Sequence, residues 1–319
     1  MKMTWTKSSG LPERWLQKCA SMNNATLAAP GQRQQRIRDI FVDHPIHHEA
    51  TKALKRFYMP VAGGIHSRGS ICALIGQSRT GKSFAANEIV VGYKSQVGQD
   101  GVKRPVLLVD CPIEGGTRGI LDRIADALGL TVSTRITNAN LIGVILRELR
   151  RAEVEFVIFD ESQELFPEKN KKILNFARAL LRKMLNLNQF NIVCIGLPET
   201  YSVIAEDPQL FGRGGLEHKH LSPYDWKNEV DQKNFRALCH KFDEEMPFEK
   251  SGFGTQDFAY RLFLASGGCI GHLKNYLIDA GNRAISDASL QVELRHFSDA
   301  YDARKRPGET FNPFNSTSN

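Results

Sequence analysis

Short apolar runs alternate with amphipathic segments through the middle of the chain. Apolar residues dominate the runs at 70–75, 105–110, 155–160 and 191–195, as in strands that are buried on both faces. Segments with apolar residues at helical spacing lie at 82–92, from about 117, at 139–151 and at about 169–187, and a polar loop is expected at 95–104. This alternation predicts an α/β fold in which a parallel sheet is covered by helices.

The two ends of the chain have different patterns. The first 30 residues are rich in polar and small residues and indicate weak structure, whereas short helices are expected at 33–42 and 48–58. Ser266-Gly267-Gly268 precedes another helix with one apolar face. We therefore predict a flexible arm at 1–32, an α/β domain with its helical lead-in at 33–222, a helical lid at 223–304 and a flexible tail at 305–319. Phe311 and Phe314 make the tail a candidate docking peptide, with plain disorder as the alternative.

The composition is that of a globular protein outside the membrane. Hydrophobic residues make up 41% and charged residues 24%, and no apolar run approaches the ~20 residues of a membrane-spanning helix. The N-terminus has no secretory pattern, and the six cysteines form no CxxC pair, as expected for reduced cysteines in an intracellular protein. We therefore expect a cytoplasmic location.

Positive charge is concentrated near the N-terminus. Residues 1–60 contain ten Lys or Arg against four Asp or Glu, whereas the rest of the chain is nearly neutral, and the total net charge is +7. A basic segment on a neutral body favours a polyanionic partner such as nucleic acid. A solvated basic arm without a binding role explains the charge about equally well.

The strongest indication of chemistry is GQSRTGKS at residues 76–83, which fits the phosphate-loop pattern GxxxxGK[ST] at every fixed position. A predicted strand precedes it and a predicted helix follows, which is the context this motif requires. Lys82 would reach the β- and γ-phosphates of ATP, and the Ser83 hydroxyl would hold magnesium. The predicted ATP-binding residues of the loop are Gly76, Gln77, Ser78, Arg79, Thr80, Gly81, Lys82 and Ser83.

A pair of carboxylates ends the third apolar run. Asp160 and Glu161 directly follow it, and the carboxyl ends of parallel strands meet at the edge of the sheet where ligands bind. Asp160 would hold magnesium, and Glu161 would orient and deprotonate the attacking water. Alone, such a pair usually marks a strand end that faces solvent. Together with the phosphate loop it predicts a site for ATP hydrolysis.

Three further positions are weaker candidates. Glu199 and Thr200 follow the fourth strand and could sense the γ-phosphate, although a helix start explains them equally well. Arg213, on a glycine-rich loop, would act as an arginine finger in the site of a neighbouring subunit, with an ordinary loop cation as the alternative. His272 and Lys274 are candidates for a second nucleotide sensor on the lid.

These motifs and their surroundings resemble the AAA+ ATPases of transposons of the TniB/TnsC type. The resemblance covers about residues 33–286 and includes the phosphate loop, the Asp160-Glu161 pair, Gly196-Leu197-Pro198-Glu199, the run 207–210 before Arg213, and Ser266-Gly267-Gly268. It implies a AAA+ P-loop ATPase with a parallel five-stranded sheet, an N-terminal helical extension and a small helical lid. The family often has an arginine beside the lid glycines, where this chain has His272.

The resemblance also implies a regulator of transposition in the bacterial cytoplasm. Such proteins bind ATP and Mg²⁺, assemble as rings or helical filaments on double-stranded DNA, and recruit or activate the transposase together with a target-selector protein. ATP hydrolysis then drives disassembly. By the same resemblance, Lys103, Arg104, Thr117 and Arg118 would contact DNA phosphates. A helicase-loader or replication-initiator-like AAA+ ATPase is the main alternative, and a signalling ATPase that acts without DNA is another.

Overall fold

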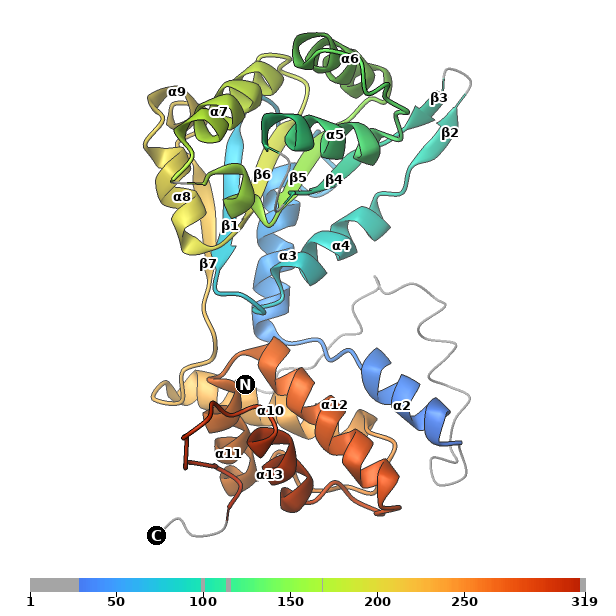
Figure 1. Ribbon diagram of the computed structural model, residues 1–319, viewed down its shortest axis with the longest axis vertical. Helices are drawn as coiled ribbons and strands as arrows, with labels where there is room; N and C mark the ends of the chain where they lie inside the picture. The colour runs from blue at the N-terminus through green and yellow to red at the C-terminus, as the bar shows by residue number, and fades with distance from the viewer. Residues whose placement is uncertain (1–28, 99–100, 113–115, 168, 316–319) are drawn as a thin grey trace. The chain divides into compact units, whose positions relative to one another are not determined.

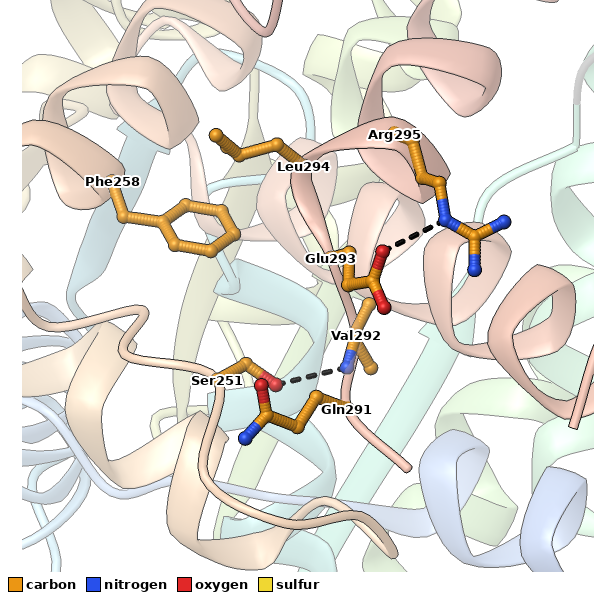
Figure 2. A pocket seen from close by; sticks show the side chains of 7 residues that line it. All are labelled: Ser251, Phe258, Gln291, Val292, Glu293, Leu294 and Arg295. Atoms are coloured by element: carbon orange, nitrogen blue, oxygen red, sulfur yellow. Dashed lines mark hydrogen bonds and ion pairs between the residues drawn. The ribbon is translucent and has the colours of Figure 1, made fainter. Parts of the chain in front are cut away.

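The computed structural model describes residues 29–98, 101–112, 116–167 and 169–315. Within them, the apolar runs form a parallel five-stranded sheet with the strand order β4-β5-β6-β1-β7 (Figure 1). The strands are β1 Ile71–Gly76, β4 Val106–Asp110, β5 Phe156–Asp160, β6 Asn191–Gly196 and β7 Glu217–Leu221. The parallel α/β architecture predicted from the sequence is confirmed.

Alternate side chains of the inner strands enter two separate cores, one on each face of the sheet. Cys72 and Leu74 pack with helices α3 Pro45–Tyr58 and α4 Lys82–Gly92, whereas Ile71 and Ala73 pack with the helices of the opposite face. Those helices are α5 Gly116–Leu128, α6 Asn138–Arg151, α7 Lys171–Leu185, α8 Pro198–Ala205 and α9 Pro208–Phe211. Burial on both faces explains why the strands are continuous apolar runs in the sequence.

Two elements lie outside the sequence prediction. The sequence EHKHL forms the edge strand β7, in which only Leu221 is fully buried. Charged residues are tolerated in an edge strand, where they prevent pairing with a strand of another chain. The segment predicted as a polar loop contains a hairpin of β2 Gln96–Gly98 and β3 Gly101–Lys103, with exposed valines paired across it. Neither element has the apolar pattern by which strands were predicted.

The described residues divide into two compact units, one of residues 45–223 and one that joins 29–44 to 224–315. The second unit contains helices α2 Pro30–Asp39, α10 Glu229–Glu245, α11 Gln256–Ser266, α12 Ile270–Ser286 and α13 Leu294–Asp302. Helix α2 packs on α12 at Gly281, where a Cβ would lie 2.8 Å from the side chain of Ile37. The α/β domain was predicted to begin at residue 33, whereas the α/β unit of the structure begins at residue 45. The difference arises because α2 buries Ile37 in the helical unit.

Two arginines of the basic segment are engaged within this helical unit. Arg33 donates to the carbonyl oxygen of Pro247 at 3.0 Å and lies over the ring of Phe248, and Arg36 donates to the carbonyl oxygen of Glu245 at 3.3 Å. These carbonyls lie at and just after the C-terminus of α10, where cations are favourable. Part of the positive charge thus has an architectural role.

Within the predicted flexible tail, residues 312–314 are buried against the helical unit, which differs from the prediction, whereas residues 306–311 are exposed. Phe314 is 2% exposed, and its ring stacks on Phe297 with 5.3 Å between centroids. Burial of this ring on α13 fixes the segment, so Phe311, which is exposed, is the one of the two phenylalanines still available for docking. The arm up to residue 28 and residues 316–319 lie outside the described residues. No helix in the described part of the chain is long and apolar enough to span a membrane.

Candidate functional site

The phosphate loop leaves the end of β1 and runs into the N-terminus of α4. Gly76 has no room for a side chain, because a Cβ there would collide with the carbonyl oxygen of Leu221 at the end of β7. Gly81 precedes α4 with φ +94°, a backbone conformation that glycine adopts without strain. The two fixed glycines of the motif are therefore required for different reasons, one by a close approach of β7 and the other by the turn into the helix.

Lys82 is held inside this loop. Its Nζ donates to the carbonyl oxygens of Gly76 at 2.8 Å and Gln77 at 2.7 Å, and the residue is 8% exposed. The Thr80 hydroxyl donates to the same Gln77 carbonyl at 2.9 Å. An ammonium group held among neutral carbonyls beside a helix N-terminus favours an anion at the mouth of the loop. The exposed residues of the loop are Gln77, Ser78 and Arg79.

Asp160 and Ser83 meet beside the loop. Asp160 accepts hydrogen bonds from the Ser83 hydroxyl and from the backbone N–H of Glu161, and it is paired in register with Asp110 at the end of β4. Burial raises the pKa of Asp160 above its ordinary value, while the two hydrogen bonds oppose that shift. The hydroxyl and the carboxylate are hard oxygen donors, so these residues fit a magnesium ion. The described residues contain no cluster of three or more His, Cys, Asp or Glu that could hold a metal, and Mg²⁺ bound through phosphates needs none.

Glu161 follows on the same edge of the sheet with an exposed side chain. Its backbone is left-handed, with φ +50°, which is uncommon for a residue other than glycine and clusters at functional sites. The chain then forms the 3-10 turn η1 Ser162–Leu165, and Gln163 Nε2 donates to Glu161 Oε2 at 2.6 Å. Sequence reasoning missed Gln163, because no motif assigns a role to the second residue after Glu161.

Glu199 and Thr200, the candidates for sensing the γ-phosphate, lie just after the end of β6. Glu199 lies in the first turn of α8, and Thr200 is 1% exposed with a hydroxyl that has no hydrogen-bond partner in the described part of the chain. Asn191 lies at the other end of β6, where its side chain donates to the carbonyl of Phe57 and accepts from the N–H of Ser70. A sensor role for Glu199 or Thr200 stays a prediction.

Arg213 lies at the opposite edge of the sheet. Its carbonyl accepts a hydrogen bond from the N–H of Ile71, the first residue of β1, whereas the phosphate loop begins at Gly76, the last one. At ~3.3 Å per residue these ends are about 17 Å apart, which is more than an arginine side chain spans. The guanidinium donates to the side chain of Asn186. Arg213 therefore cannot reach the phosphate loop of its own chain.

The four residues predicted to contact DNA lie at both ends of α5. Arg104 donates to the carbonyl of Ala127 in the last turn, next to Lys103, whereas Thr117 and Arg118 lie in the first turn. A 13-residue helix is about 20 Å long, so the fold does not gather the four into one patch. Other intramolecular partners are Glu153 for Lys103, Asn138 for Thr117, and Asp122 and Ile136 for Arg118. Contact with DNA stays a prediction.

His272 and Lys274, the candidates for a second sensor, lie on α12 in the helical unit. Lys274 donates to the carbonyl of Ile40, which follows α2, and burial lowers the pKa of its ammonium group to about 8. This contact gives Lys274 a structural role. His272 is exposed and is the better candidate for the sensor, a role that stays a prediction.

Comparisons with known proteins extend these observations. The family model described as bacterial TniB protein matches residues 36–225. The structure is similar to the ORC1 protein of Aeropyrum pernix in complex with DNA, with 16% identity, a TM-score of 0.63 and coverage of 85% of this chain and 69% of that one. It is also similar to Cdc6p from Pyrobaculum aerophilum, with 14% identity, a TM-score of 0.59 and coverage of 83% and 69%. No curated protein matched the sequence.

At these identities the structural likeness shows the fold alone, which this chain shares with ORC1 and Cdc6p. The sequence match is the stronger finding, because it covers more than half of the chain and includes the whole sheet with its phosphate loop. The resemblance inferred from the motifs is thus confirmed, and the protein belongs to the TniB family.

Proposed function

We propose that this protein is an ATP-dependent, DNA-binding regulator of transposition that hydrolyses ATP. The observation that carries the proposal is the meeting of Lys82, Asp160 and Glu161 at one edge of the sheet, in a chain of the TniB family. A cationic loop, a carboxylate beside a serine hydroxyl and an exposed second carboxylate are the groups that hydrolysis of a nucleoside triphosphate requires.

In this mechanism the phosphates of ATP bind to the N–H groups of the loop and the N-terminus of α4. Lys82 exchanges the carbonyls of Gly76 and Gln77 for phosphate oxygens, which offer its charge a better partner. Ser83 and Asp160 would hold Mg²⁺, which would neutralise charge on the β- and γ-phosphates. Glu161 accepts a proton from the water that attacks the γ-phosphate.

Arg213 would complete the site of a neighbouring chain. Its location at the edge opposite the phosphate loop supports this role, because a head-to-tail contact joins opposite edges of successive chains. Such contacts produce rings when they close and helical filaments when they do not. ATP at the contact would make assembly depend on nucleotide, since a ligand stabilises the state that binds it.

Double-stranded DNA is the proposed support for this assembly. Membership of the TniB family favours it, and ORC1 of Aeropyrum pernix, which shares the fold, was solved in complex with DNA. Lys103 and Arg118 would contribute phosphate contacts, which give affinity with little sequence preference. The transposase and a target-selector protein are the further partners proposed on the family's behaviour, and the bacterial cytoplasm is the proposed location.

The test combines ATP turnover, DNA binding and electron microscopy. We expect turnover that duplex DNA stimulates, DNA affinity that falls steeply with salt, and rings or filaments on duplex DNA with a slowly hydrolysed ATP analogue. Binding to a helicase without binding to duplex DNA would instead favour a helicase loader. Turnover with no response to DNA would favour a signalling ATPase.

A further inference from the structure

The 3-10 turn that follows Glu161 is fastened to the end of β6. The Ser162 hydroxyl donates to the carbonyl of Ile195 at 2.8 Å, and the N–H of Leu197 donates to Gln163 Oε1 at 3.3 Å. Ser162 is fully buried and Gln163 is half-buried. Two contacts between segments more than 30 residues apart therefore hold the turn and the strand end together.

Gly196 makes this close approach possible. A Cβ at Gly196 would lie 2.6 Å from Thr200 Oγ1, 2.7 Å from Gln163 Oε1 and 3.0 Å from Ser162 Oγ. Three polar side chains thus converge on the space beside the end of β6. Because a side chain at position 196 would displace Gln163, the glycine is as much a part of this arrangement as the three polar residues.

The side-chain amide of Gln163 has one favourable orientation. Its Nε2 donates to Glu161 Oε2 at 2.6 Å, while its Oε1 accepts from the N–H of Leu197. A reversed amide would place two acceptors together at Glu161 and two donors together at Leu197. Glu161 is exposed, so this bond restricts its carboxylate to one of several rotamers.

We propose that Gln163 is the positioning residue for Glu161, and that it ties the carboxylate to the turn between β6 and α8. The inference rests on the proposed function, in which Glu161 accepts the proton of the attacking water. A general base acts only when it lies within hydrogen-bond reach of that water in the correct direction. A displacement of the turn at Leu197 reaches Glu161 through this one amide.

Two variants separate positioning from simple fastening of the turn. Gln163→Leu removes both hydrogen bonds, whereas Gln163→Glu keeps an acceptor for Leu197 and presents a like charge to Glu161. In the full-length chain with duplex DNA, we expect each to lower kcat by ~10- to 100-fold, since a misplaced group can cost about that much. The KM for ATP and the affinity for an ATP analogue should change by less than about three-fold. Wild-type kcat in Gln163→Glu would overturn the proposal.

Gln189→Leu is a matched control. Gln189 donates to the carbonyls of Leu149 at 3.0 Å and Val154 at 2.8 Å at the opposite edge of the sheet. Its loss should lower the unfolding temperature and leave kcat unchanged at temperatures where the chain is folded. A fall in kcat as large as that of Gln163→Leu would show that instability, and not lost positioning, explains both variants.

A double variant distinguishes failure of this inference from failure of the proposed function. If Gln163 acts through Glu161, Gln163→Leu should cost nothing further in a Glu161→Gln background. If Gln163→Leu still lowered kcat by ~10- to 100-fold in that background, the inference would be overturned. Wild-type turnover in Glu161→Gln alone would remove Glu161 from the mechanism and Gln163 with it. An inactive Glu161→Gln beside a fully active Gln163→Leu would overturn only the role of Gln163.

Discussion

The sheet has one edge where its strands end and another where they begin. Polar side chains have different partners at these two edges. Where the strands end, Lys82 binds carbonyls five and six residues away, and Glu161 binds Gln163 two residues away. Where they begin, Asn191 binds Phe57, 134 residues away. Local partners can be exchanged for a ligand without unfolding anything, whereas distant partners join segments of the chain. The charged groups at the first edge can therefore exchange their partners for a ligand, while Ser162 and Gln163 beside them join that edge to the end of β6. The contacts at the second edge serve architecture.

Arg213 tests this distinction most severely, because it lies at the architectural edge and is assigned a catalytic role. We expect Arg213→Ala to lower ATP turnover in the assembled state by ~10³- to 10⁵-fold, the contribution typical of an arginine finger. Binding of ATP to the isolated chain should be unchanged, which filter binding or fluorescence would measure. Arg151→Ala is the control, since this exposed arginine pairs with Glu148 at the same edge and should have no effect on turnover.

Mixing two inactive variants shows whether Arg213 acts between chains. Lys82→Ala lacks the phosphate contact but keeps its arginine, and Arg213→Ala keeps an intact loop. In a head-to-tail assembly the second variant receives the arginine of the first, so the mixture should be more active than either variant alone. Turnover no higher than the sum of the separate variants would contradict a role in a neighbouring site.

Glu161→Gln should have the next largest effect. General-base catalysis contributes about 10²- to 10⁴-fold, so we expect kcat to fall by that amount. ATP binding and the unfolding temperature should stay close to wild type, because the side chain is exposed and its partner is local. The assembly on DNA should be trapped, as negative-stain images with ATP would reveal. A variant that hydrolyses ATP and disassembles normally would contradict the proposed role of Glu161.

The contrast between local and distant partners also explains what could be predicted from the sequence. The phosphate loop and the Asp160-Glu161 pair have fixed spacing, so the pattern alone identified the edge of the sheet where they meet. Gln163 could not be found in this way, because its second contact is the N–H of Leu197, which only the pairing of β5 with β6 brings close. The helical periodicity of α2 predicted a helix but not the surface that buries Ile37.

Asn191→Leu tests whether the edge where the strands begin contributes to stability and not to catalysis. Asn191 is 3% exposed and holds the carbonyl of Phe57 and the N–H of Ser70, so its replacement leaves two polar groups without partners. We expect the free energy of unfolding to fall by about 2–6 kcal/mol, at about 1–3 kcal/mol for each group. Urea denaturation would measure the loss. The kcat of the folded variant should equal that of wild type, and a large fall would show that the two edges are coupled.

Tyr58→Phe should have the smallest effect, with a distinctive pH dependence. Tyr58 is buried and donates to Glu155 at the start of β5, so losing the bond should cost about 1 kcal/mol near neutral pH.

Burial, together with the bond to Glu155, raises the pKa of Tyr58 well above its ordinary value. In the unfolded chain this phenol loses its proton near pH 10, while the folded chain retains it. The stabilisation from Tyr58 is therefore complete below pH 10 and declines above it, because the unfolded state then binds fewer protons. Denaturation curves at pH 8 to 11 should show the difference between wild type and variant shrinking at the alkaline end, and a constant difference would mean that Tyr58 titrates normally in the folded protein.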